Sequence, residues 1–197
     1  ALGLKAGNAR NDILAKIAQS WARQSPLKAL AWTSTLVPEA RGHATSRALE
    51  SWSKNHPEKA AQYLDENPNP KYLKIIANQW SKRDPEDTAN WIASKPESPQ
   101  RDSALADTLW HWTTQTPKAA TAWIEALPAG NSRDQAIAGL AVAAVEFDPR
   151  SALEWSLKIT TPSLRNDLSQ HTFKAWSRND PKIAQQWAND HQFSPDN

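Results

Sequence analysis

The sequence predicts an all-α protein, a right-handed α–α superhelix (a solenoid) of six helical hairpins in a single domain. Three observations lead to this prediction. A spacing of tryptophan, proline and tryptophan recurs six times, at intervals of 28 to 32 residues along the 197-residue chain. Apolar residues before each first tryptophan fall on one face of a helix. Proline, with 14 residues, keeps to a few fixed places in each repeat, and periodic helical hairpins of this length form stacked arrays.

The repeats align on the pattern W-x4-P-x5-W, with one departure in each aromatic slot. The first aromatic slot holds Trp21, Trp52, Trp80, Trp112, Ala144 and Trp176. The proline slot holds Pro26, Pro57, Pro85, Pro117, Pro149 and Pro181. The second aromatic slot holds Trp32, Tyr63, Trp91, Trp123, Trp155 and Trp187. We assign the six repeats to residues 10–38, 41–68, 71–96, 100–128, 132–162 and 164–195.

Two helices are expected in each repeat, called helix A and helix B. In helix A, apolar residues stand eight and seven, then four and three residues before the first slot, and at the slot itself. Ile13, Leu14, Ile17, Ala18 and Trp21 show this in the first repeat. That spacing places them on one face of a helix, which packs in the core.

The slot proline is expected to open helix B, because the first helical residue has no intrahelical use for its N–H. The residues before it are Ser25, His56, Asp84, Thr116, Asp148 and Asp180, and all except histidine are good N-caps. Three residues after the proline comes a small side chain that lets helix B approach helix A: Ala29, Ala60, Thr88, Ala120, Ala152 or Ala184.

A second set of prolines is expected to end helix B, because a residue before proline is biased away from α. This set is Pro38, Pro68, Pro96, Pro128 and Pro162, with Pro195 in the same role in the sixth repeat. Two remaining prolines, Pro70 and Pro99, are expected in loops between repeats.

The slot tryptophans are expected to fill the core between hairpins; the alternative is an aromatic platform for sugars or bases.

An arginine eleven residues before the first slot recurs as Arg10, Arg41, Arg101, Arg133 and Arg165. We expect it to reach the last carbonyls of the preceding helix B or to lie over a tryptophan. A row that binds acidic partners is the alternative. The position two residues after the slot is expected to form a solvated rim, with Arg23, Lys54, Lys82 and Arg178.

The repeat resembles a shortened tetratricopeptide repeat. Residues 14–38, LAKIAQSWARQSPLKALAWTSTLVP, carry an aromatic late in helix A, an early alanine in helix B, a second aromatic and a closing proline. The period is shorter than the 34 residues of that family, and its early glycine is missing. The array also resembles tandem W-x4-P-x2-A-x2-W arrays of uncharacterised bacterial proteins. The resemblance implies binding of a protein or peptide on the concave face lined by helix A.

The repeat pattern breaks in repeats four and five. The position two residues before the first slot should face solvent, and it reads Gln19, Glu50, Asn78, Trp110, Val142 and Lys174. In repeat five, outward positions are also expected to include Ala138, Gly139, Val145 and Phe147, so its helix A is apolar nearly all round. Either a neighbouring repeat covers this helix, or it forms an apolar partner groove with Trp110.

Other functions find little support in the sequence. The formal net charge of +2 gives no reason to expect nucleic acid as a partner, and without cysteine there is no disulfide or thiolate metal site. The longest apolar run, residues 136–145, is too short to cross a membrane. No histidine motif, phosphate loop or dinucleotide fingerprint indicates a metal, a cofactor or catalysis. The cytoplasm and the periplasm of a bacterium both stay open.

The leading hypothesis is therefore a non-catalytic scaffold that binds a protein or peptide on the helix A face of repeats four and five. A helical domain of a larger enzyme is the second hypothesis, and a repeat-based glycan or nucleic-acid reader is the third. Residues 4–10, LKAGNAR, match residues 127–133, LPAGNSR, which suggests a piece of a longer protein. The partner and the oligomeric state are not readable from the sequence.

Overall fold

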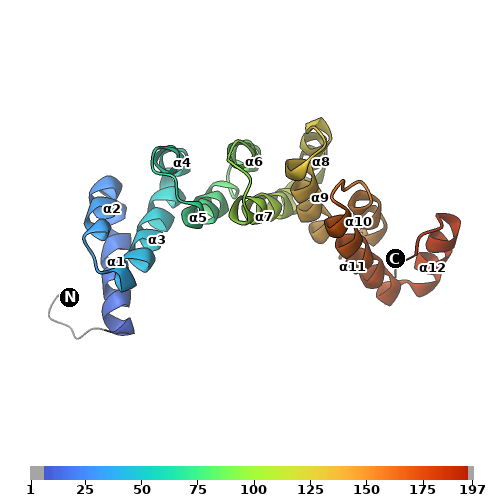
Figure 1. Cartoon of the computed structure of the whole chain (residues 1–197), viewed down its shortest axis with the longest axis horizontal. Helices are drawn as coiled ribbons and strands as arrows, with labels where there is room; N and C mark the ends of the chain where they lie inside the picture. Colours follow the sequence, from blue (N-terminus) through green and yellow to red (C-terminus); the bar gives the residue numbers. More distant parts are fainter. Residues whose placement is uncertain (1–6, 195–197) are drawn as a thin grey trace. The chain divides into compact units, whose positions relative to one another are not determined.

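The computed structural model describes residues 7–194, and within this range the chain is all helical, with no strand (Figure 1). Its twelve helices are α1 (Asn8–Ala22), α2 (Pro26–Ser34), α3 (Pro38–Asn55), α4 (Pro57–Glu66), α5 (Pro70–Trp80), α6 (Pro85–Ala93), α7 (Pro99–Gln115), α8 (Pro117–Ala126), α9 (Asn131–Ala144), α10 (Pro149–Ser156), α11 (Pro162–Asn179) and α12 (Pro181–Asp190). Each predicted repeat thus contains two helices, which is compatible with a helical repeat.

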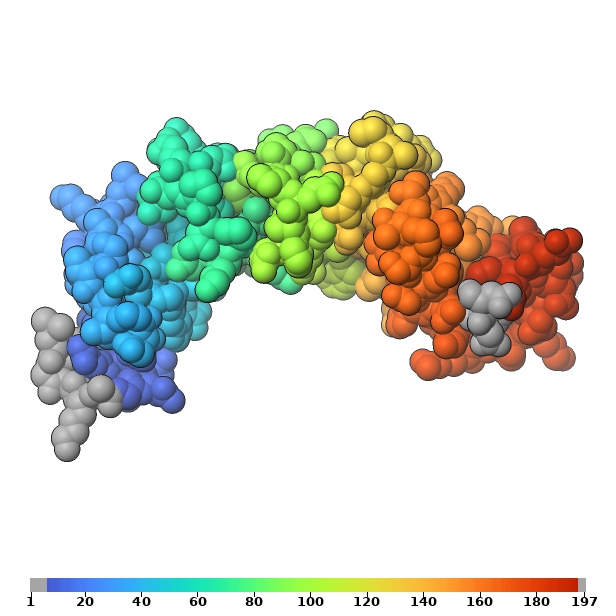
Figure 2. All heavy atoms as spheres, in the orientation of Figure 1, coloured from blue at the N-terminus to red at the C-terminus, as the bar shows by residue number. Residues whose placement is uncertain are grey.

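The chain divides into two compact units, an N-terminal unit Ala1–Arg83 and a C-terminal unit Asp84–Asn197. The boundary falls inside the third repeat, between α5 and α6. In the N-terminal unit α3 packs on α1, α4 and α5; in the C-terminal unit α9 packs on α7, α8, α10 and α11. Within each unit the colours of Figure 2 follow the order of the chain, so helices close in sequence are neighbours in space. A single continuous domain stays a prediction.

The slot prolines open helix B as predicted: each is the first residue of α2, α4, α6, α8, α10 or α12. The small residue three positions later is completely buried in all six repeats. The predicted side-chain caps form less often. Asp148 accepts a hydrogen bond from the Ser151 N–H (3.1 Å), whereas Ser25, Thr116 and Asp180 make no such bond. The proline, more than the cap, therefore marks the corner between the two helices.

The second set of prolines does not all end helices. Pro38 and Pro162 are the first residues of the next helix A, and so are Pro70 and Pro99, the two prolines predicted to lie in loops. The prediction is wrong because α2 and α10 already end at Ser34 and Ser156, before any proline, so that Pro38 and Pro162 can take the first helical position. Pro68, Pro96 and Pro128 do lie between helices. Pro195 and part of the LKAGNAR segment lie outside the described residues.

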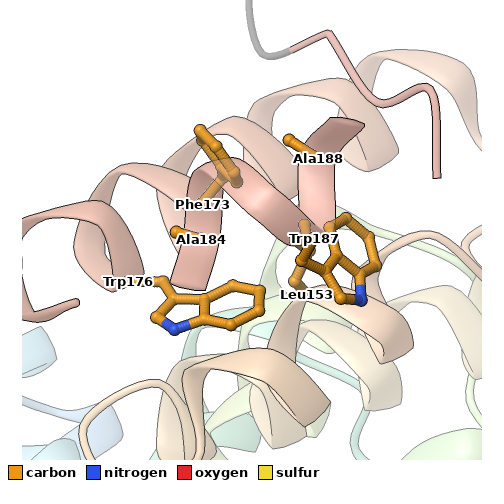
Figure 3. Packing of buried hydrophobic residues seen from close by; sticks show 6 residues of the cluster. All are labelled: Leu153, Phe173, Trp176, Ala184, Trp187 and Ala188. Carbon is orange, nitrogen blue, oxygen red and sulfur yellow. The ribbon is translucent and has the colours of Figure 1, made fainter. Parts of the chain in front are cut away.

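The two aromatic slots of a repeat contact each other across the corner. The ring centroids of Trp52 and Tyr63 lie 5.6 Å apart, and the pair Trp176–Trp187 lies 5.9 Å apart. Both rings of the last pair belong to the buried cluster shown in Figure 3. There Leu153 of α10 joins them, which connects repeats five and six. Tilted ring pairs of this kind stabilise the fold by more than the burial of their apolar area alone provides.

Three of the recurring arginines tie a helix A to the segment that precedes it, which is close to one of the two predicted roles. The Arg41 guanidinium donates to the Leu36 carbonyl (3.0 and 3.2 Å), and the Arg165 guanidinium donates to the Ile159 carbonyl (3.3 Å). Arg101, almost fully buried, reaches the Ala93 carbonyl at 3.4 Å and pairs with Asp102 at 2.8 Å. Ala93 is the last residue of α6, so Arg101 reaches a carbonyl that a helix end leaves without an intrahelical partner. Leu36 and Ile159 follow the ends of α2 and α10, so Arg41 and Arg165 reach carbonyls of the loops and not of helix B.

Candidate functional site

The structure divides the six residues predicted to contact a partner. Trp110, Val142 and Phe147 are exposed, with exposed fractions of 41%, 45% and 85%. Ala138 is half-buried. Gly139 and Val145, predicted to face outward, are buried, so that part of the prediction is wrong.

The burial of Gly139 and Val145 has a physical cause in each case. A Cβ placed on Gly139 would lie 2.1 Å from the carbonyl oxygen of Ala106, so α9 approaches the backbone of α7 where the side chain is missing. Val145 holds the position one residue after the first slot. The same position is buried in the four preceding repeats, where it is Ala22, Ser53, Ser81 and Thr113. Neither residue can therefore be reached by a partner.

Trp110 and Val142 remain as an outward apolar pair, which we call the α7/α9 surface. They hold the same position in consecutive repeats, and the helices that carry them pack against each other. The Trp110 ring also makes an edge contact with His111, with 4.8 Å between ring centroids. An exposed tryptophan beside an exposed valine is typical of an interaction surface.

The equivalent positions in the N-terminal unit border a polar groove instead. Gln19 and Glu50 line a hollow of about 610 Å³ together with Arg23, Lys54 and Lys82. The sequence predicts a solvated rim for these three cations, and it does not predict that they line one hollow. The apolar character of the α7/α9 surface is thus a property of repeats four and five and not of the repeat in general.

A second exposed apolar set lies on repeat one. Ile13, Ile17 and Trp21 follow one another every four residues on α1, and their exposed fractions are 38%, 39% and 39%. In repeats two, four and six the residues at these three positions are all buried. The sequence pattern predicts that the three side chains pack in the core, and the structure exposes them instead. The apolar spacing of a helix face is the same whether or not another helix covers that face.

Beside Ala144 lies a hollow that sequence reasoning missed. Its volume is about 630 Å³, and it lies between repeats four and five. The residues that line it include Thr113, Pro117, Leu140, Ala144, Phe147 and Trp155. The absence of a tryptophan from the fifth slot is visible in the sequence, whereas the hollow that Ala144 lines is not.

The buried carboxylate of Asp134 is a structural group. Its oxygens accept hydrogen bonds from the N–H and hydroxyl groups of Thr160 and Thr161, all at 2.7–2.8 Å. Burial by itself raises the pKa of Asp134, but the four hydrogen bonds outweigh it, so this pKa lies below its ordinary value. The carboxylate joins the start of α9 to the segment before α11.

Among residues 7–194, no group of three or more histidine, aspartate or glutamate side chains could hold a metal ion. In the same range, no helix has the length and apolar character needed to cross a bilayer. No family model matches the chain, no curated protein matches it, and no solved structure matches it.

Proposed function

We propose that the chain is a tetratricopeptide-like right-handed superhelix that acts as a non-catalytic scaffold. It binds a protein or peptide partner through the α7/α9 surface, with the half-buried Ala138 and the exposed Phe147 as further candidate contacts. The single observation that carries the proposal is the exposure of Trp110 and Val142 at equivalent positions of two packed helices.

The contrast with the N-terminal unit supports this assignment. There the same repeat position is polar and half-buried, in Gln19, Glu50 and Asn78. If any residue type were acceptable at this position, apolar residues would not be expected in two adjacent repeats. Two adjacent repeats each expose a large apolar side chain at this position, and removing such side chains from water on binding is favourable.

Selection of peptides from a random library on the immobilised chain tests the proposal. The selected peptides are then titrated into the wild type, into the double variant Trp110→Glu/Val142→Lys, and into the matched control Gln19→Glu/Glu50→Lys. We expect the first variant to lose at least about tenfold in affinity, which is roughly 1.4 kcal/mol, and the control to keep it. Equal affinity for all three proteins, or no enrichment of any peptide, would show that the α7/α9 surface is not a peptide site.

A further inference from the structure

Repeat five lacks an indole that the other repeats have. In repeats one, two, four and six the first-slot tryptophan contacts the second-slot ring, with centroids 5.6–5.9 Å apart. Repeat five keeps the second ring, Trp155, but has Ala144 in the first slot. Trp155 therefore has no first-slot indole to contact, whereas the equivalent ring has one in those four repeats.

The hollow beside Ala144 reaches the place of that indole, since both Ala144 and Trp155 line it. It has a counterpart of about 430 Å³ between repeats one and two, lined by residues that include Trp52. The two hollows share repeat positions: Thr113 corresponds to Ala22, Pro117 to Pro26, and Ala144 to Trp52. The hollow with alanine is the larger one, at about 630 Å³, and it extends to the buried side chain of Leu140 and to Trp155.

We propose that this hollow binds the indole ring of a tryptophan side chain from the partner protein. The ring would take the place that the chain's own tryptophan takes in the other repeats. The chemistry of the occupant follows from the chain itself, because this position is an indole in all five other repeats and the ring that it contacts, Trp155, is retained. The inference rests on the proposed function only in that the ring comes from a partner protein.

The surroundings of the hollow suit such a ring. Leu140, Ala144, Phe147 and Trp155 give it an apolar lining, and Phe147 is the most exposed large apolar side chain of the described residues. Polar side chains, among them Lys118 and Asp148, complete the lining, and a mainly apolar hollow with some polar groups is typical of ligand sites. Stacked or edge-on aromatic rings attract each other.

An NMR titration with N-acetyl-tryptophanamide tests the inference without the partner. The signal of the Trp155 indole N–H, assigned through Trp155→Phe, is expected to shift on titration with saturable behaviour, and N-acetyl-alaninamide is expected to leave it unchanged. The variant Ala144→Trp restores the slot indole, so it should weaken binding of the probe at least about tenfold. Its melting temperature should equal or exceed that of the wild type, since the added ring fills existing space.

Two further variants make the outcome decisive. Thr121→Trp, from α8, fills the same hollow and replaces Ala144→Trp if that protein does not fold. Trp110→Glu/Val142→Lys should leave probe binding unchanged, so the two proposals are tested separately: either the peptide site on the α7/α9 surface or the indole site can be disproved without the other. The inference is overturned if the filled variants bind the probe as well as the wild type does, or if saturating probe does not shift the Trp155 signal.

Discussion

The ring centroids of Trp112 and Trp123 lie 5.9 Å apart, with their planes inclined by 53°. Trp112 ends the apolar face of α7, and Trp123 follows in α8, after the corner at Pro117. Trp123 also donates its indole N–H to the Asn90 side chain of the previous repeat, at 2.9 Å. One aromatic pair thus fixes the angle between the two helices of a repeat and connects that repeat to its neighbour.

The approach of helix B to helix A requires a small side chain at position 120. Ala120 is completely buried, whereas its neighbour Ala119 is exposed. We expect Ala120→Leu to destabilise the protein by about 1–3 kcal/mol, because added methylene groups force a packed interface apart. Ala119→Leu is the matched control, with little expected change. Urea unfolding measures both, and equal effects of the two substitutions would refute the close approach of α8 to α7.

Two helical glycines should respond to alanine in opposite directions. Gly42 has open space where a Cβ would be, so Gly42→Ala should stabilise the protein by about 0.5–1 kcal/mol through helix propensity. At Gly139 a Cβ would lie 2.1 Å from the Ala106 carbonyl oxygen, so Gly139→Ala must push α9 from α7. We expect a net loss of about 1–3 kcal/mol in thermal or urea unfolding. A stabilised Gly139→Ala protein would contradict the described packing of α7 and α9.

Asp134 should make the free energy of unfolding depend on pH. Its pKa is lowered in the folded state, so its contribution is fully present above the unfolded-state value of about 4 and is lost as the pH falls through the folded-state value. Asp134→Asn should destabilise the protein by about 1–3 kcal/mol at pH 7, since the amide cannot accept all four hydrogen bonds. The difference between variant and wild type should shrink below pH 4 in urea unfolding. A difference independent of pH would show that the charge is not what Thr160 and Thr161 stabilise.

The features of the fold that follow from fixed spacing could be predicted from the sequence. The slot prolines and the buried small residues hold fixed positions relative to the slots of every repeat, so one physical explanation serves all six. The role of Pro38 and Pro162 could not be predicted in this way. Proline suits both the residue after a helix and the first residue of the next, and the choice depends on where helix B ends.

The site was less predictable, because it depends on what lies opposite each residue. Gly139 looks outward by its repeat position, yet it is buried because it has no side chain to hold α7 away. Ile13 and Ile17 look like core residues by pattern, yet they are exposed. The hollow at Ala144 is larger than its counterpart at Trp52, where the slot indole is present, and single-sequence periodicity does not measure volume.

The most direct test compares two tryptophans that stand two residues apart on α7. Trp112 is buried in the slot, and Trp110 is exposed on the α7/α9 surface. The account predicts that Trp112→Ala lowers the free energy of unfolding by about 3–5 kcal/mol and that Trp110→Ala lowers it by less than half as much. It also predicts that peptides selected on the chain bind more weakly to Trp110→Ala and as tightly as before to folded Trp112→Ala. Equal losses of stability, with peptide affinity unaffected by Trp110→Ala, would contradict the division between packing and binding positions.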